Sequence, residues 1–173
     1  MEPCQLFQFC PRCGQQPPGA PTAPFRCPAC GLVLYFNPAV AVGVILLGPD
    51  ERALLVRRAH EPAKGKLGLP GGFVDFGETA EEALRREVRE EVSLELASFE
   101  FLCSAVNAYA YRDVTYPVLD LFFVARAEAV GRAAPLDGVA GLCWLRPAEI
   151  NLDEIAFPSM RQALRVFNAR GGK

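Results

Sequence analysis

Apolar runs and mixed apolar–polar stretches follow one another along the middle of the chain. The runs AVAVGVILL (39–47) and ALLVRR (53–58) predict two strands, and the GPDE segment between them predicts a hairpin turn. In FGETAEEALRREVREEV (76–92), apolar residues recur three and four positions apart, which predicts an amphipathic helix that begins near Glu78 or Thr79.

The second half of the chain continues this pattern. FEFLCSAV (99–106), YPVLDLFFVAR (116–126) and GLCWL (141–145) predict three more strands. Pro158 and Ser159 predict the start of a second helix, which runs to about Ala169. Strands mixed with two helices indicate an α/β domain in which a sheet is flanked by helices.

Residues 1–36 lack this periodicity and predict a separate small unit. Their GQQPPGAPTAPFR stretch is rich in Pro and Gly and contains little to build a core. Cys10-Pro-Arg-Cys13-Gly and Cys27-Pro-Ala-Cys30-Gly repeat one pattern on either side of it. Two C-x-x-C pairs favour a tetrahedral, structural zinc site, with a redox dithiol as the alternative.

Composition and charge limit the classes of function. Hydrophobic residues make up 51% of the 173 positions, which is enough for a core, and 18 basic against 20 acidic residues give a net charge of −2. This balance argues against a protein that mainly binds nucleic acid or an anionic membrane. The chain has neither an apolar run long enough to span a membrane nor a signal peptide, so we expect a cytoplasmic protein.

The glutamates of REVREEVS (86–93) are the first candidates for chemistry. On a helical wheel, Glu87 and Glu91 fall in the sector of Ala80 and Leu84, which faces the sheet, and Glu90 lies at its flank. Carboxylates crowded toward the protein are costly unless a cation such as Mg²⁺ lies between them. A solvated, charged helix face is the alternative reading.

The preceding LPGG turn strengthens the interpretation as a metal site. Gly71 and Gly72 let the backbone come close to a ligand, and their carbonyls can join the coordination shell of a metal ion. Arg86, next to Glu87, could orient one of the carboxylates.

At these residues the sequence resembles the Nudix box, G-x5-E-x7-R-E-U-x-E-E-x-G-U with U aliphatic. From Gly72, five residues lead to Glu78 and seven more lead to Arg86-Glu87, followed by VREEVSL. Each fixed position matches except the late glycine, which is Ser93. The resemblance covers about residues 37–170, and the first 36 residues are similar to the zinc ribbon attached to some members, including NADH pyrophosphatases.

The resemblance implies an α/β fold, the Nudix α/β/α sandwich with a mixed sheet (37–173), preceded by a small zinc ribbon (1–36). It implies a hydrolase that uses Mg²⁺ or Mn²⁺ to cleave the pyrophosphate bond of a nucleoside diphosphate linked to another moiety. Glu78 would have a mainly structural role and Arg86 would orient the glutamates. The implied magnesium ligands are the Gly71 carbonyl, Glu87, Glu90 and Glu91, and the implied zinc ligands are Cys10, Cys13, Cys27 and Cys30.

Two departures from the family pattern bear on the mechanism and the substrate. Gly138 and Gly141 stand where many members carry acidic residues before the tryptophan, here Trp144, so Asp137, Asp120 or Asp113 would have to supply an additional acid. The chain also has CSAVNAYAYRDVTYP in place of the S-Q-P-W-P-F-P-x-S signature of NADH-cleaving members.

Three side chains are candidates for contact with the substrate. Lys64 could meet phosphates, or it could belong to a solvated loop. Tyr109 and Tyr111 could stack on a base, although tyrosines in strands are more often core or edge residues.

Two classes of function remain open on the sequence alone. The intact R-E-x-x-E-E core favours an enzyme acting on ADP-ribose, a sugar nucleotide or a dinucleotide. The glycines before Trp144 favour a catalytically weak nucleotide-binding sensor with a zinc ribbon. In either case we expect a small-molecule nucleotide partner, neither membrane nor nucleic acid, and a homodimer as an option.

Overall fold

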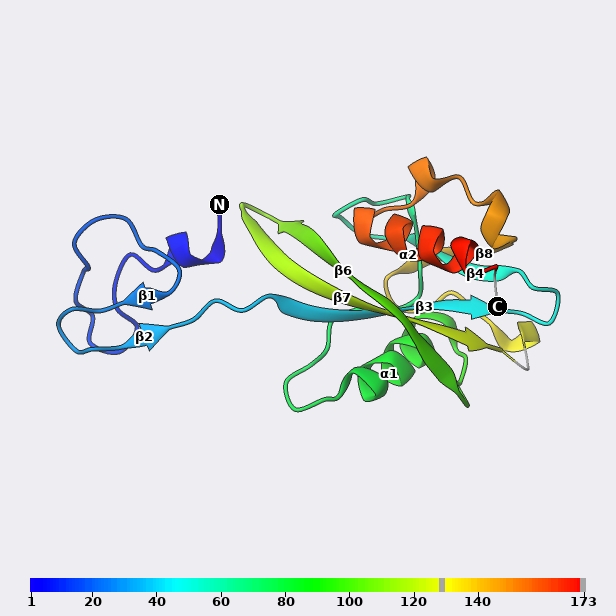
Figure 1. Ribbon diagram of the computed structural model, residues 1–173, viewed down its shortest axis with the longest axis horizontal. Coiled ribbons are helices and arrows are strands. Elements are labelled where there is room, and N and C mark those ends of the chain that lie inside the picture. Colours follow the sequence, from blue (N-terminus) through cyan, green and yellow to red (C-terminus); the bar gives the residue numbers. More distant parts are fainter. Residues whose placement is uncertain (128–129, 172–173) are drawn as a thin grey trace. The chain divides into compact units, whose positions relative to one another are not determined.

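The computed structural model describes residues 1–127 and 130–171, and its contacts divide the chain into two compact units (Figure 1). One unit combines Met1–Pro38 with Ala108–Pro117, and the other combines Ala39–Asn107 with Val118–Lys173. We call them the cysteine unit and the sheet unit. No helix within the described residues is both long and apolar enough to cross a membrane.

A six-stranded mixed sheet forms the centre of the sheet unit. The strand order is β5-β4-β3-β7-β6, with β8 paired to β4. β3 runs parallel to β7, whereas β4 is antiparallel to β3, β5 and β8. The strands are β3 (Ala39–Leu47), β4 (Ala53–Arg58), β5 (Leu67–Gly68), β6 (Phe99–Tyr111), β7 (Val114–Arg126) and β8 (Val139–Leu145).

The hairpin predicted between the first two long strands is confirmed. Leu47 pairs with Ala53, and the Gly48 N–H donates to the Arg52 carbonyl at 2.8 Å. The strands predicted at 99–106 and 116–126 are longer in the structure, because β6 continues to Tyr111 and β7 already begins at Val114. Arg112, in the turn between them, has a positive φ of 52°.

Helix α1 (Ala80–Val92) begins and ends where its capping residues dictate. The Thr79 side chain accepts from the Glu82 N–H while the Glu82 side chain accepts from the Thr79 N–H, a capping box that fixes the first turn. At the other end Ser93 adopts the left-handed conformation with φ 59° and ψ 31°. The helix buries Ala83, Leu84, Val88 and Val92.

We expect Ser93→Gly to stabilise the sheet unit by about 1 kcal/mol, because a left-handed backbone costs a residue with a Cβ about that much. In a domain of this size, Tm should rise by about 2–4 °C. Ser104→Gly, in the interior of β6, is the matched control and should lower Tm because glycine weakens a strand. Equal Tm for Ser93→Gly and the unmodified protein would contradict this account of the helix end.

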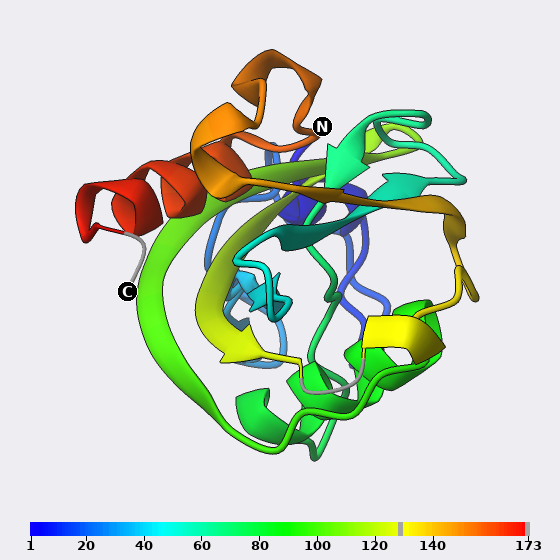
Figure 2. The ribbon, with the colours of Figure 1, turned by 90° about the vertical axis from the view of Figure 1, so that its right-hand side faces the viewer.

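The two helices cover opposite faces of the sheet (Figures 1 and 2). Leu84 and Val88 of α1 pack with Val44 and Phe123 in one core cluster. Leu164 of α2 packs with Ile45, Phe122 and others in a second. Helix α2 spans Pro158–Ala169, as the sequence predicts, and short 3-10 turns lie at Val130–Arg132, Pro147–Glu149 and Leu152–Glu154.

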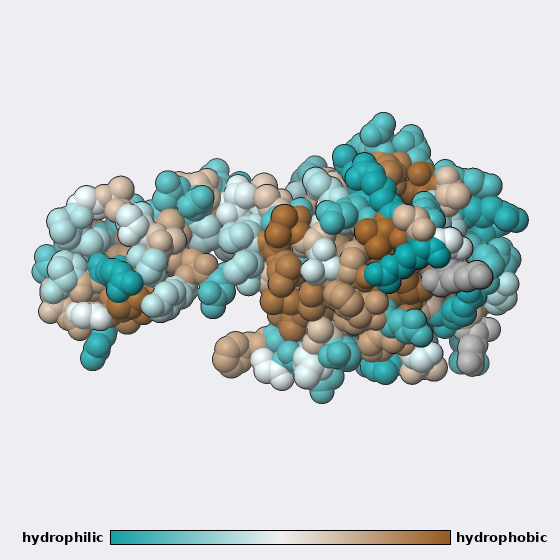
Figure 3. All heavy atoms as spheres, viewed as in Figure 1, coloured by the Kyte–Doolittle hydropathy of each residue, from teal (hydrophilic) through white to brown (hydrophobic). Residues whose placement is uncertain are grey.

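Apolar side chains are exposed on β6 and β7 of the sheet unit (Figure 3). The large ones are Phe101, Val106 and Leu119. Since β6 lies at the end of the strand order, Phe101 and Val106 lie on the edge strand of the described sheet, a surface type through which chains associate. The homodimer remains a prediction.

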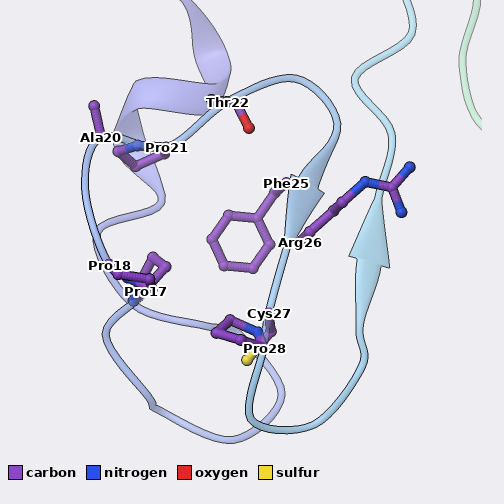
Figure 4. A pocket seen from close by; sticks show the side chains of 9 residues that line it. All are labelled: Pro17, Pro18, Ala20, Pro21, Thr22, Phe25, Arg26, Cys27 and Pro28. Atoms are coloured by element: carbon purple, nitrogen blue, oxygen red, sulfur yellow. The ribbon is translucent and has the colours of Figure 1, made fainter.

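The cysteine unit is built from short elements around one aromatic ring. It contains a 3-10 helix at Pro3–Leu6 and the antiparallel strands β1 (Phe25–Arg26) and β2 (Val33–Leu34). Figure 4 shows the Phe25 ring surrounded by Pro17, Pro18, Pro21 and Pro28, beside a pocket of about 320 Å³. Phe25 is 1% exposed and forms a cluster with Cys10 and Cys27, so the apolar core of this unit adjoins its thiols.

Candidate active site and cysteine cluster

The Arg86 guanidinium holds three carboxylates in place. Its Nε and Nη2 donate to the two oxygens of Glu78, each at 2.9 Å, in a bidentate pair. Its Nη1 donates to Glu87 at 2.8 Å and to Glu90 at 3.2 Å, and Nη2 also reaches the Phe73 carbonyl at 3.0 Å. One arginine therefore fixes the start of α1 and two glutamates a turn apart.

Arg86 and burial shift the pKa values of Glu78 and Glu87 in opposite directions. Hydrogen bonds from Arg86 hold the pKa of Glu78 below its usual range. Burial raises the pKa of Glu87, whose side chain is 16% exposed, and the Arg86 contact opposes that rise only in part. Glu90 is 52% exposed and lies at the solvent edge of the cluster.

Glu91 is the most strongly perturbed of the glutamates. Burial raises its pKa to about 7, and the charges of Glu87 and Asp137 add to that rise. The Gly71 N–H, which donates to Glu91 at 3.0 Å, and the Arg58 charge act in the opposite direction. Burial is therefore the main cause of the raised pKa, and the nearby positive groups offset it only in part.

The glycine turn lies against the same carboxylates. Gly71 has φ 139°, and a Cβ there would lie 2.1 Å from the Val42 carbonyl oxygen. A Cβ on Gly72 would lie 2.4 Å from a Glu87 oxygen. Only glycine fits at position 71, where the neighbour is the backbone of strand β3, whereas a side chain at position 72 would displace the Glu87 carboxylate.

The donor set suits a hard divalent cation. Glu87 and Glu91 offer half-buried carboxylate oxygens, and burial raises the pKa of both groups more than the nearby positive charges lower it. Mg²⁺ and Mn²⁺ prefer such oxygen ligands. Across the described chain, the four cysteines are the one group whose ligand atoms lie within 4.8 Å of one another. The glutamate oxygens are less tightly gathered, and Arg86 donates hydrogen bonds to both Glu87 and Glu90.

The additional acids suggested by the sequence separate in space. Asp137 lies near the glutamates, because its N–H donates to the Glu90 carbonyl at 3.3 Å and its charge raises the pKa of Glu91. Asp120 instead lies on the other face of the sheet, where burial raises its pKa and the Ser159 side chain of α2 opposes that rise only in part. Asp113 belongs to the cysteine unit, where its carbonyl accepts from the N-terminal amine.

The predicted substrate contacts are distributed over both units. Lys64 is exposed in the sheet unit, and its backbone N–H donates to Glu61 at 3.4 Å. Tyr109 and Tyr111 belong to the cysteine unit, and the Arg112 guanidinium lies 5.4 Å from the Tyr111 ring centroid. A role for these three residues remains a prediction.

Arg58 is a candidate that the sequence pattern did not single out. Its charge lowers the pKa of Glu91, its Nε donates to the Pro62 carbonyl at 2.9 Å, and its guanidinium lies 5.0 Å from the Phe157 ring centroid. In the sequence, its position at the end of the predicted strand 53–58, just before the loop that leads to the glycine turn, could have indicated a role at the site.

The four cysteines of the N-terminal motif converge. Cys10 and Cys30 sulfurs lie 3.7 Å apart, and those of Cys13 and Cys27 lie 3.6 Å apart. A tetrahedral zinc ion with Zn–S bonds of about 2.3 Å would place its sulfurs about 3.8 Å apart. The arrangement therefore fits a closed zinc site.

The two C-x-x-C segments form matching turns. The Gly14 N–H donates to the Cys10 carbonyl at 2.9 Å, and the Gly31 N–H donates to the Cys27 carbonyl at 3.0 Å. Burial tends to raise the pKa of Cys10, but backbone N–H groups in its turn lower it to about 6. The pKa of Cys13 moves the other way, to about 12, because burial and the neighbouring thiols favour its protonated form; zinc ligation would require all four cysteines as thiolates.

We expect Arg86→Lys to lower kcat/KM by about 10- to 100-fold, because a lysine cannot hold two carboxylates in a fixed fork. Arg89→Lys is the matched control: Arg89 lies on the same helix and pairs with Glu95 at 2.7 Å, but both side chains are largely exposed. Steady-state rates for the two variants should differ, and equal losses would contradict a special role for the Arg86 cluster.

Comparison with known proteins places these residues in a family context. The NUDIX domain family matches residues 37–167. Among curated relatives, the chain is 52% identical over 61 residues to an ADP-ribose pyrophosphatase of Methanocaldococcus jannaschii, covering 35% of this chain and 36% of that protein. It is 38% identical over 98 residues to the mitochondrial NAD(P)H pyrophosphatase NUDT13 of Homo sapiens, covering 56% and 27%.

Solved structures show a similar architecture. A NUDIX hydrolase from Nitrosomonas europaea matches with a TM-score of 0.70 at 26% identity, over 96% of this chain and 94% of that one. A MutT NUDIX hydrolase from Burkholderia pseudomallei matches with a TM-score of 0.60 at 30% identity, over 75% and 97%. By contrast, the chain spans only about a third of the length of the curated relatives it matches.

Proposed function

Because the chain belongs to the NUDIX domain family, we propose that it is a divalent-metal-dependent hydrolase of nucleoside diphosphate derivatives. The bond cleaved would be the pyrophosphate bond that joins the nucleotide to its other moiety. One observation carries the proposal: Arg86 holds Glu78, Glu87 and Glu90 while Glu91, on the same helix, is buried against the glycine turn.

Each residue of this cluster has a proposed task. Glu87, Glu90, Glu91 and the Gly71 carbonyl would hold Mg²⁺ or Mn²⁺, which when bound supplies charge neutralisation at the diphosphate and activation of water. Arg86 keeps two of the carboxylates oriented, and Glu78 keeps Arg86 in place. Asp137, whose N–H donates to the Glu90 carbonyl, would supply the additional acid.

The relatives suggest where to begin the search for a substrate. One is an ADP-ribose pyrophosphatase and another an NAD(P)H pyrophosphatase. Since the chain lacks the S-Q-P-W-P-F-P-x-S signature, we place ADP-ribose and related nucleoside diphosphate derivatives before NADH. The partner would therefore be a small nucleotide.

We further propose that residues 1–36 form a zinc ribbon with Cys10, Cys13, Cys27 and Cys30 as ligands, and that the hydrolase domain occupies 37–173. A closed four-thiolate site does no chemistry, so the ion would stabilise a segment whose own core is small.

The test is a panel of ADP-ribose, sugar nucleotides, dinucleoside polyphosphates and NADH, each with Mg²⁺ or Mn²⁺. Products should be separated chromatographically. The proposal expects a nucleoside monophosphate and a second phosphorylated product from at least one compound, which identifies cleavage of the pyrophosphate bond. Tight binding of a nucleotide without any product would instead favour a ligand sensor.

A further inference from the structure

A cavity of about 420 Å³ lies in the sheet unit, where β7 and α2 end. It is lined by residues 98–102 at the start of β6, residues 124–126 at the end of β7, Leu47 at the end of β3, and Arg170 directly after α2. The ends of β3 and α2 lie at the same end of this unit (Figure 1). A cavity of this volume is large enough for a small-molecule ligand.

The cavity is remote from the glutamates of α1. The Gly72 carbonyl accepts from the Val42 N–H at 2.8 Å, and Leu47 lies further along the same strand. With a rise of about 3.3 Å per residue, residues 42 and 47 are about 16 Å apart along β3. Leu47 and Leu102 also belong to the core cluster beneath α2, whereas α1 packs on the other face. A ligand in the cavity would therefore occupy a site separate from the glycine turn.

Arg170 brings a positive charge without a carboxylate partner to this cavity. Its Nη2 donates to the Leu102 carbonyl at 2.8 Å, which fixes the guanidinium beside β6. Among the residues that the structure describes, no ion pair includes Arg170. A guanidinium carries several N–H donors in a planar fork, so one bond to a neutral carbonyl leaves donors for an anion.

Arg126 is the second guanidinium that lines the cavity. Its Nη1 and Nη2 donate to the two oxygens of Glu51, the latter at 3.1 Å. The side chains of this pair are 59% and 55% exposed, and exposed pairs of this kind are weak. An anionic ligand would therefore compete with Glu51 for Arg126 at little cost.

An adjoining cavity adds to the positive charge of this region. It has a volume of about 400 Å³, shares Leu47 with the first cavity and lies against Phe167 of α2. Together the two cavities are lined by three arginines and two glutamates: Arg126, Arg146, Arg170, Glu51 and Glu100. Because Glu51 already pairs with Arg126, the remaining arginines outnumber the remaining glutamate.

We propose that Arg170 and Arg126 bind the phosphate group of a small phosphomonoester in the first cavity. A guanidinium fork matches the oxygens of a phosphate group, and such charge-assisted hydrogen bonds are strong. The apolar side of the cavity, formed by Leu47, Leu102 and Val124, accommodates the organic part of the ligand. None of these residues belongs to the proposed metal site, so the proposal stands independently of the hydrolase.

The experiment measures binding of AMP and of ribose 5-phosphate by calorimetry. It uses the zinc-loaded full chain without added Mg²⁺ or Mn²⁺, with adenosine as the ligand that lacks the phosphate. AMP should bind at least about tenfold more tightly than adenosine, and Arg170→Gln should weaken both phosphomonoesters by about tenfold or more, because hydrogen bonds to a charged group are lost. Arg165→Gln is the matched control, an exposed arginine of α2 outside both cavities, and should leave the affinities unchanged.

Glu51→Gln tests the proposal in the opposite direction with Arg170 intact. Glutamine removes the negative charge that competes for Arg126, so AMP should bind about two- to fivefold more tightly. This variant decides the matter even where Arg170→Gln fails to fold.

Three results would overturn the proposal. One is binding of neither phosphomonoester to the unmodified protein, and another is an equal loss of affinity in Arg165→Gln and Arg170→Gln. The third is AMP binding that is lost in Glu91→Gln but unchanged in Glu51→Gln and Arg170→Gln, which would place the nucleotide at the α1 glutamates instead.

Discussion

Replacing Glu91 by glutamine is expected to lower kcat by about 10³-fold, with the protein still folded. Glutamine keeps the shape of the side chain and can still accept from the Gly71 N–H, but it removes the charge that the proposed metal ion needs. Loss of metal-based stabilisation of the transition state is worth several kcal/mol, and about 4 kcal/mol corresponds to roughly a thousandfold in rate. Steady-state kinetics on the best substrate of the panel measures the effect.

Glu95→Gln provides the control for this change. Glu95 follows the same helix and pairs with Arg89, but its side chain is 69% exposed. The kcat of Glu95→Gln should stay within about twofold of that of the unmodified protein, because exposed ion pairs contribute little to the stability of the fold. A Glu91→Gln variant that retains most of its activity would place the chemistry elsewhere.

The second large effect concerns the cysteine unit. Cys27→Ser should abolish zinc binding and unfold Met1–Pro38, because a structural zinc site contributes about 10–16 kcal/mol and the segment has only a small apolar cluster to hold it otherwise. Zinc content by elemental analysis and limited proteolysis of the N-terminal segment are the readouts. The Cys27→Ser variant should lose its zinc and become sensitive to the protease in the N-terminal segment.

Cys4→Ser is the matched control for the cysteine unit. Cys4 is also buried there, but it lies outside the four-cysteine cluster, so its variant should keep the zinc ion and resist the protease. Retention of zinc in Cys27→Ser, or equal protease sensitivity of both variants, would contradict the assignment of the cluster as a structural site.

Local signals explain why much of the fold could be predicted from the sequence. Thr79 and Glu82 form a capping box three residues apart, and Pro158 occupies the first turn of α2, so both helix starts depend only on neighbours in the chain. The extent of β6 and β7 could not be predicted in this way. The NAYAYRDVTY segment between them has no glycine or proline turn, and Arg112 supplies the positive φ instead.

The same distinction applies to the candidate site. Arg86, Glu87 and Glu90 are one and four residues apart on a helix, so their contacts follow from its geometry. Arg58 and Asp120 depend on which strands pair and which face each residue occupies, and a one-residue change in register would reverse that face. Their surroundings could therefore be found only from the assembled sheet.

The most direct test of the central claim measures Mn²⁺ binding and turnover together in zinc-loaded protein. Electron paramagnetic resonance reports bound Mn²⁺, and product formation from the best substrate is followed in the same samples. We predict that turnover rises in step with bound Mn²⁺ in the unmodified protein, and that Glu91→Gln loses both. Full turnover in the absence of added divalent metal, or unchanged Mn²⁺ binding in Glu91→Gln, would contradict the assignment of the α1 glutamates as the metal site of a hydrolase.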